Sequence, residues 1–334
     1  MKWCTALRAG IEKEAMKMQK TNLLTIIGLV FCLAGLVTTS WAEDSGNSTP
    51  AIFPASAFRG EKVYEKACTA CHGDNGDGNG SGAAPLNPKP RDFTKGIYKF
   101  HSTPIGELPT DADLLRILTN GIPHSQMPAW NRTLTEQERV DVVAYIKGFS
   151  ESFKDPIPDT VEIPEPPASS SAFVGEGRKV FMTMECWACH GVQGKGDGKA
   201  AKTLMDSWGH SIRPANFTEC RYKGGNDAKS IYRTINTGLN GTPMSGFADA
   251  FLFGGDKVLD TANYKGSFSS KEVDELLAYL KSQPAQAAIE GMPEDKKTEL
   301  AQHRKWALVL YIRSLIQKPS VFRWLFTEDM ELTR

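Results

Sequence analysis

The stretch Cys68-Thr69-Ala70-Cys71-His72 returns later in the chain as Cys186-Trp187-Ala188-Cys189-His190. Each copy places two thiols about one helical turn apart, with an imidazole directly after the second thiol. This is the attachment sequence of c-type haem, because two thiols at this spacing can each add to one vinyl group of the same porphyrin. We therefore predict covalent haem attachment at Cys68, Cys71, Cys186 and Cys189. We also predict that His72 and His190 are the proximal iron ligands.

Two other uses of paired cysteines fit the sequence less well. The two pairs lie more than one hundred residues apart, whereas the pairs of a zinc ribbon are separated by about 15–20 residues. A thioredoxin-like site has one such pair in a βαβ context, which the sequence lacks. With seven cysteines in total, a complete set of intramolecular disulfides is also excluded.

The repeat extends beyond the motif, which indicates an internal duplication. A Gly-rich loop follows each motif, and Pro90-Arg91-Asp92-Phe93-Thr94 corresponds to Pro214-Ala215-Asn216-Phe217-Thr218. The Gly-rich loop at 74–80 lacks oxygen ligands at two positions that a calcium loop needs, so we interpret it as a tight turn. Each copy then continues into a predicted helix that ends at a glycine, Gly121 or Gly238.

The duplication also selects the second axial ligand of each iron. Met127 lies 55 residues after His72, and Met244 lies 54 residues after His190. Both follow the helix-ending glycine by six positions, and an aromatic residue, Trp130 or Phe247, comes three positions later. The remaining candidates, His101, His124 and His210, stand opposite residues that cannot ligate. We therefore predict Met127 and Met244 as iron ligands, although methionine is more often a core residue.

The domain boundaries follow from the repeat. The first copy closes with a helix that opens on the capping box Thr135-Glu136-Gln137-Glu138. In the second copy both 271–282 and 303–315 match this helix; we favour 303–315, which makes about 248–300 an insertion. The predicted units are 53–150, a Pro-rich linker at 151–172 that is either a semi-rigid spacer or an unstructured tether, 173–318, and a tail at 319–334.

Residues 1–42 read as a signal peptide, with lysines before an apolar run and small residues at the cleavage site. The alternative is a retained membrane anchor, although the run is shorter than the roughly 20 residues of a span. The full sequence of 334 residues has 39 basic and 39 acidic side chains, so it lacks the basic excess of a nucleic-acid-binding protein.

These motifs give the chain a resemblance to tandem di-haem cytochromes c built from two class I domains. The resemblance covers about 53–150 and 173–318. It implies an all-α fold in which each domain wraps around one covalent haem c. It also implies that each proximal histidine donates to a backbone carbonyl, near 85–90 in the first copy and 211–214 in the second. Similar chains often serve as electron-transfer subunits of periplasmic respiratory oxidoreductases, a step that rests on analogy alone.

Two functions remain open at this point. Matched methionine ligands favour a periplasmic electron carrier or electron-transfer subunit, exported by its signal peptide, which is not itself an enzyme. Its partners would be redox proteins, with no nucleic acid, and with membrane contact only if the signal segment is retained. The alternative is a di-haem enzyme, of the peroxidase or sulfur-compound dehydrogenase type, in which one haem keeps an open position.

Overall fold

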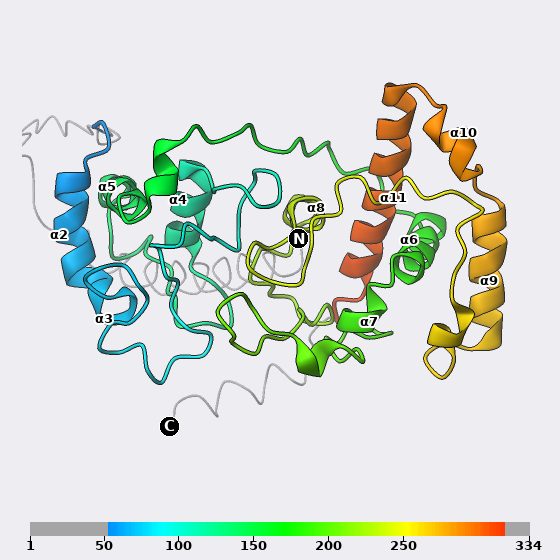
Figure 1. Cartoon of the computed structure of the whole chain (residues 1–334), viewed down its shortest axis with the longest axis horizontal. Coiled ribbons are helices and arrows are strands. Elements are labelled where there is room, and N and C mark those ends of the chain that lie inside the picture. The colour runs from blue at the N-terminus through cyan, green and yellow to red at the C-terminus, as the bar shows by residue number, and fades with distance from the viewer. Residues whose placement is uncertain (1–52, 318–334) are drawn as a thin grey trace, which may run out of the picture. The chain divides into compact units, whose positions relative to one another are not determined.

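The regular structure is entirely helical in the computed structural model, which describes residues 53–317. Only two isolated bridges pair extended backbone within this range, so the all-α fold class is confirmed. The signal segment and the tail at 319–334 lie outside the described residues. In chain order (Figure 1) the helices are α2 (Ala57–Ala67), α3 (Thr69–His72), α4 (Asp111–Asn120), α5 (Glu136–Lys147), α6 (Ser171–Thr183), α7 (Trp187–His190), α8 (Ala228–Thr237), α9 (Ser270–Lys281), α10 (Gln286–Glu290) and α11 (Glu294–Ser314).

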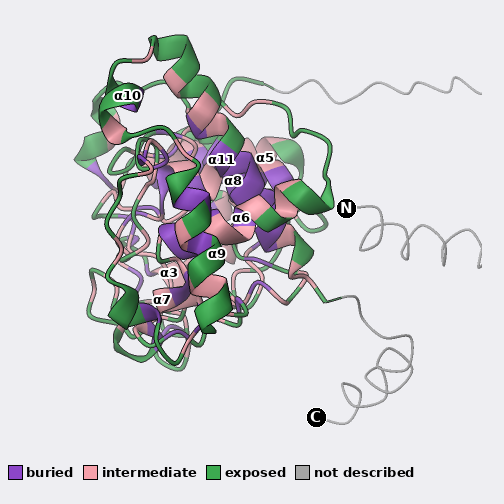
Figure 2. Ribbon diagram, turned by 90° about the vertical axis from the view of Figure 1, so that its right-hand side faces the viewer, coloured by how far each residue is buried: buried purple, intermediate pink, exposed green. Residues whose placement is uncertain are grey.

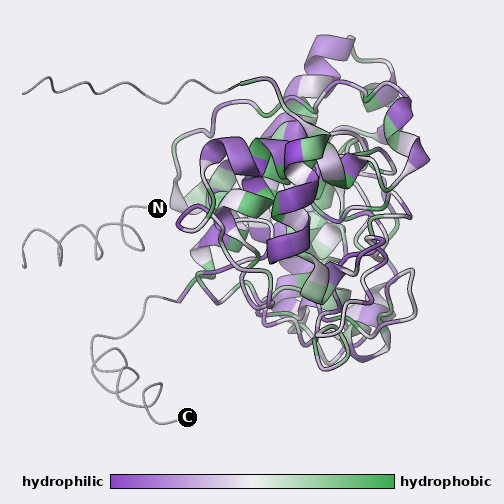
Figure 3. Cartoon of the chain, turned by 90° about the vertical axis from the view of Figure 1, so that its left-hand side faces the viewer, coloured by the Kyte–Doolittle hydropathy of each residue, from purple (hydrophilic) through white to green (hydrophobic). Residues whose placement is uncertain are grey.

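The first half is organised by the crossing of α2 and α5, which lie side by side in Figure 1. Gly60 of α2 permits this crossing, because a Cβ atom there would lie 2.0 Å from the carbonyl oxygen of Asp141 in α5. Arg59 and Asp141 then form an ion pair at 2.7 Å across the two helices. Helix α4 also packs against α5. Figure 3 shows that the helices on this side carry both hydrophilic and hydrophobic residues. The core consists of Tyr64, Cys68, Phe93, Tyr98, Leu114, Leu118, Val142, Val143 and Ile146.

The second half repeats the crossing with α6 and α11. Gly177 of α6 faces α11 as Gly60 faces α5, since a Cβ atom there would lie 1.9 Å from the carbonyl oxygen of Ala307. Helix α8 packs on α11 as well. The helix that occupies the closing position is therefore α11, which covers 303–314 of the stretch 303–315 and begins earlier, at Glu294. Figure 2 shows α11 with buried residues along much of its length and α10 largely exposed.

Helix α9 has the sequence signature of the closing helix without its place in the packing. The predicted capping box of α5 is confirmed, with Glu138 accepting from the Thr135 amide at 2.8 Å. Helix α9 begins with the same device, in which Glu272 accepts from the Ser269 amide at 2.9 Å. Its contact with α6 is much smaller than that of α11. A similar pattern of caps and apolar residues thus serves two different positions in the fold.

One fully buried arginine ties the segment at 251–283 to α11. The Arg304 guanidinium donates to the carbonyl oxygens of Phe251 and Phe253 at 2.7 and 2.8 Å, and to the side chain of Gln283 at 2.8 Å. It also lies over the Phe253 ring, 4.0 Å from the centroid. Burial lowers the pKa of Arg304. These hydrogen bonds offset part of the cost of removing the cation from water.

The Pro-rich segment between the halves has no helix from 156 to 170, and it contacts both halves. The Val161 amide donates to the Ser102 carbonyl of the first half at 2.7 Å. Ile163 packs against the core of the second half, and Glu165 pairs with Lys229 of α8. Within 53–317, no helix has the length and apolar character of a membrane span.

Candidate functional site

Each Cys-x-x-Cys-His motif forms a short helix directly after the first long helix of its half. The amide of His72 donates to the Cys68 carbonyl, and that of His190 to the Cys186 carbonyl, both at 2.9 Å. The second copy has one extra residue before its first cysteine, and Glu185 there adopts a left-handed conformation with φ of 54°. The extra residue is absorbed in this turn, so both motifs keep the same helical form.

The first thiol of each motif lies in an apolar environment. Burial raises the pKa of Cys68 to about 11 and that of Cys186 to about 12. Neither is in a disulfide. A thiol of this kind stays protonated at neutral pH and is a poor thiolate ligand or nucleophile. In the part of the chain that the structure describes, no group of three His, Cys, Asp or Glu side chains is arranged to hold a metal ion.

Both motif histidines are held in the same way. His72 Nδ1 lies 3.0 Å from the Arg91 carbonyl oxygen, and His190 Nδ1 lies 3.1 Å from that of Ala215. Burial lowers the pKa of both imidazoles, which favours the neutral ring. A neutral ring that donates through Nδ1 keeps the lone pair of Nε2 available for a metal. The acceptors lie one residue beyond the stretches 85–90 and 211–214 where we expected them.

An aromatic ring fixes the plane of each imidazole. Phe93 stacks on His72 with centroids 4.5 Å apart, and Phe217 stacks on His190 at 4.3 Å. The Gly-rich loop places these rings, because the Phe93 amide donates to Gly76 and the Phe217 amide to Gly194. Several glycines in these loops have positive φ, as tight turns require, among them Gly73, Gly76, Gly78, Gly191, Gly194 and Gly196.

The two methionines lie in loops with matching hydrogen bonds. In the first loop the Ile122 amide donates to the Met127 carbonyl at 3.0 Å, and the Met127 amide donates to Ser125 Oγ at 3.2 Å. In the second, Leu239 donates to Met244 at 2.9 Å, and Met244 donates to Thr242 Oγ1 at 3.2 Å.

The start and end of each methionine loop are also alike. The amides of Trp130 and Phe247 return to α4 and α8, where they donate to Leu118 and Ile235 at 2.9 Å. Gly121 and Gly238 permit the return, because a Cβ atom at either would clash with the backbone of its loop. Met127 packs against the first core together with Trp130. The two loops therefore hold Met127 and Met244 with the same pattern of backbone hydrogen bonds.

The other histidines have different surroundings. His101 is buried, with Nδ1 2.9 Å from the Thr103 carbonyl oxygen and Nε2 without a hydrogen-bond partner. His124 is exposed and lies 3.2 Å from the Arg221 carbonyl oxygen and 3.3 Å from Glu219. The amide of His210 donates to Asp206 at 3.0 Å. None of the three has both the stacked phenylalanine and the carbonyl partner of the motif histidines.

Two half-buried cations, Arg91 and Lys99, were missed in the sequence. Arg91 supplies the carbonyl that binds His72, and its guanidinium lies over the Trp208 ring, 4.2 Å from the centroid. Lys99 pairs with Asp206 at 3.3 Å. Burial lowers the pKa of both cations. The signal was present in the repeat, since Arg91 stands where the second copy has Ala215.

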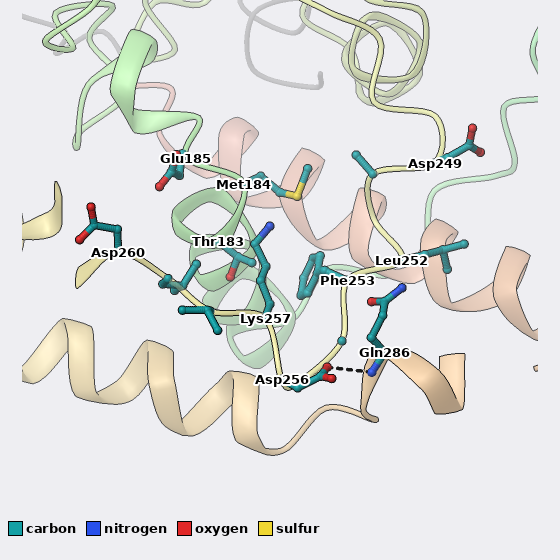
Figure 4. A pocket seen from close by; sticks show the side chains of 14 residues that line it. Thr183, Met184, Glu185, Asp249, Leu252, Phe253, Asp256, Lys257, Asp260 and Gln286 are labelled. Carbon is teal, nitrogen blue, oxygen red and sulfur yellow. Dashed lines mark hydrogen bonds between the residues drawn. The ribbon is translucent and has the colours of Figure 1, made fainter. Parts of the chain in front are cut away.

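A pocket of about 770 Å³ opens beside the second motif (Figure 4). Residues at 249–260 form most of its wall, and Met184 and Glu185, just before Cys186, form another part. Asp256 is fixed there by the Gln286 amide at 2.8 Å. Glu185, Asp249, Asp256 and Asp260 make the rim mainly acidic, with Lys257 among them. The pocket thus lies next to the attachment motif, and neither His190 nor Met244 lines it.

Comparisons with known proteins match the two halves separately. Residues 55–146 match the family described as "Cytochrome C oxidase, cbb3-type, subunit III", and residues 174–284 match the family described as "Cytochrome c". A solved chain from the reducing HAO-like protein complex of Kuenenia stuttgartiensis is 34% identical, with a TM-score of 0.62. That match covers 80% of the present chain and 100% of the other chain. The second family match includes α9 and stops before α11.

Proposed function

This chain belongs to the cytochromes c, with two such domains in tandem, and from that premise we propose that it carries single electrons through two haems c. One observation carries the proposal: each half has a neutral motif histidine bound to a backbone carbonyl and a methionine loop with the same hydrogen bonds as in the other half. Two equivalent six-coordinate irons need one histidine and one methionine each, and each half of the chain supplies such a pair.

The residues of the chain fit haem c in each domain. We assign covalent attachment to Cys68 and Cys71 in the first domain, and to Cys186 and Cys189 in the second. The glycines after each motif let the loop fold back tightly on the motif helix, since a Cβ atom at Gly80 or Gly198 would lie 2.3 Å from a backbone oxygen of that helix. Arg91 and Lys99 supply positive charge in the first domain that suits the haem carboxylates.

The axial ligands follow from the same pairs of histidine and methionine. We assign His72 and Met127 to the first iron, and His190 and Met244 to the second. Bound haem supplies an iron that cycles between Fe(III) and Fe(II). The chain keeps each imidazole neutral and oriented through the Arg91 and Ala215 carbonyls, a contact that also raises the ligand's basicity. Trp130 and Phe247 add apolar surface near each methionine, which excludes water.

With methionine on both irons no position is left for a substrate, so we propose that the chain itself is not an enzyme. Cytochrome c domains are typically extracytoplasmic, and we place this one in the periplasm or an equivalent compartment. The similar Kuenenia chain belongs to a reducing HAO-like protein complex. By that likeness we propose that this chain is an electron-transfer subunit of a periplasmic oxidoreductase complex.

Optical spectroscopy of the oxidised holoprotein tests the carrier against the di-haem enzyme. Methionine bound to Fe(III) gives a weak far-red band, and we expect its intensity to correspond to two haems per chain. Haem content is measured independently on the same sample. A band that corresponds to one haem, together with a high-spin signal from the other, would contradict the carrier and support an enzyme with one open iron.

A further inference from the structure

The loop that presents Met244 is bound to the other domain. Asn240 lies in this loop between Gly238 and Met244 and is buried, with 7% of its surface exposed. The Gly106 amide of the first domain donates to Asn240 Oδ1 at 2.8 Å. Asn240 Nδ2 donates to the Glu107 carbonyl oxygen at 2.9 Å. The side-chain amide of Asn240 therefore uses its donor and acceptor groups on consecutive residues of the first domain.

Apolar contact reinforces this junction at both ends of the loop. A Cβ atom at Gly238 would lie 2.7 Å from Cδ1 of Ile105, and one at Gly246 would lie 3.2 Å from Ile105 Cβ. Glycine at these two positions leaves the space that Ile105 occupies. The segment at 105–107 thus touches the Met244 loop before, within and after the stretch that leads to the methionine.

The first domain has no equivalent of this side chain. The position that corresponds to Asn240 is Pro123, which cannot form a similar pair of hydrogen bonds. The Met127 loop contacts the second domain through His124, an exposed residue that lies 3.2 Å from the Arg221 carbonyl oxygen and 3.3 Å from Glu219. Of the two otherwise matching loops, the second is the one fixed across the domain boundary by a buried polar side chain.

We propose that Asn240 is a positioning residue for the second iron, holding the Met244 loop against the first domain so that Met244 stays on the metal. The proposal rests on the assignment of Met244 as a ligand. A methionine leaves the iron when its loop moves away, and moving this loop breaks both bonds of Asn240. The strength of the second axial bond is therefore set by the neighbouring domain as well as by its own.

Imidazole competition on the oxidised full-length holoprotein measures this directly. Imidazole replaces methionine on the iron, and the far-red band falls as each methionine is displaced. In Asn240→Ala, we expect half of the band to disappear at an imidazole concentration roughly tenfold lower than in the unmodified protein, as the loss of two hydrogen bonds predicts. The other half, from the first haem, should titrate as before and acts as an internal reference.

The matched control is Asn120→Ala. Asn120 is an exposed residue next to the Met127 loop, and its amide bonds only to the Arg116 carbonyl within α4. We expect this variant to titrate like the unmodified protein. Equal behaviour of Asn240→Ala and Asn120→Ala would overturn the proposal. If Asn240→Ala does not accumulate, Asn240→Asp replaces it. This variant keeps an acceptor for Gly106 but places a carboxylate oxygen against the Glu107 carbonyl oxygen, so its shift should be in the same direction and at least as large.

Met244→Ala separates a failure of this inference from a failure of the ligand assignment. Loss of half of the far-red band in Met244→Ala establishes the ligand, and an unchanged titration of Asn240→Ala then refutes only the positioning role. Retention of the full band in Met244→Ala would refute the ligand assignment, and with it the present inference.

Discussion

Gly177 in α6 lies so close to Ala307 in α11 that a side-chain carbon on Gly177 would sit 1.9 Å from the Ala307 carbonyl oxygen. Gly60 and Asp141 have the same relationship in the first domain, at 2.0 Å. The contact joins the helix before each attachment motif to the closing helix. The position of the motif therefore depends on a glycine that lies outside it.

We expect Gly177→Ala to destabilise the holoprotein by about 2 kcal/mol, because the two helices must separate to admit the methyl group. Chemical denaturation measures this change in the free energy of unfolding. Gly175→Ala, on the same helix, is the control, since a Cβ atom there meets nothing within 4 Å. That variant should be neutral or slightly more stable, because alanine favours a helix. Equal stabilities of the two variants would contradict the close crossing.

Cys71→Ala should affect attachment of the first haem only. One thioether bond is lost there, while the motif at Cys186 and Cys189 is unchanged. Mass spectrometry under denaturing conditions and haem staining should show weakened attachment in the first domain. Cys220→Ala, outside both motifs, should retain two normally attached haems. Two normally attached haems in Cys71→Ala would show that the motif was wrongly assigned.

Met127→His should keep the first haem attached and lower its reduction potential. Imidazole donates more strongly to iron than a thioether and favours Fe(III), and we expect a shift of a few hundred mV within the roughly 0.8 V that axial ligands span. Spectroelectrochemical titration resolves the two haems. Met205→Leu, at an exposed methionine outside the ligand loops, should leave both potentials unchanged. A titration of Met127→His that matches the unmodified protein would remove Met127 as a ligand.

Asp113 makes stability depend on pH. Burial alone would raise its pKa, but hydrogen bonds from Ser102 and Thr110 outweigh it and hold the pKa below its ordinary value. A carboxyl with a depressed folded pKa stabilises the protein above its unfolded pKa, near 3.9, and loses this effect as the pH falls through the folded value. We expect Asp113→Asn to cost about 1–2 kcal/mol at pH 7.

The difference between Asp113→Asn and the unmodified protein should begin to shrink below about pH 4, where the unfolded chain takes up the proton, and should level off below the lower pKa of the folded carboxyl. Unfolding free energies measured at several pH values test this. The control is Asp111→Asn, because Asp111 lies on the same helix, is largely exposed, and forms only a surface pair with Lys147. A surface pair contributes little, so this variant should stay close to the unmodified protein. A constant difference for Asp113→Asn at all pH values would exclude the carboxyl as its source.

The sequence predicts the helical fold and the repeated histidine and methionine positions, because both are encoded in short motifs at fixed spacings. The Cys-x-x-Cys-His motifs and the fixed offset between Gly121 and Met127, or Gly238 and Met244, are visible in one chain. The closing helix is harder to predict, because α9 and α11 share a pattern and only packing on α6 separates them. Whether the site residues bind haem as we assign them stays a prediction for these experiments.

Other features depend on pairs of residues that are distant in the chain and have no repeat partner. In the sequence, Asn240 looks like an ordinary loop residue. The structure shows that its side chain forms hydrogen bonds with Gly106 and Glu107. Arg304 reads as one more basic residue of an amphipathic helix, yet it is fully buried and holds the segment at 251–283. No periodicity encodes such contacts, since each joins one side chain to backbone groups of a separate segment.

The extended segment at 156–170 joins the two domains and contacts Ser102 in one and Lys229 in the other. This covalent connection lowers the number of contacts that the domains need to stay together. A short covalent tether keeps the two domains at a millimolar effective concentration. Contacts that would be too few to join two separate proteins are then sufficient, because they form within one molecule. A protease cut within 156–170 would leave the hydrogen-bonding groups of the Met244 loop unchanged. The two domains would then separate on dilution, because nothing covalent holds them together.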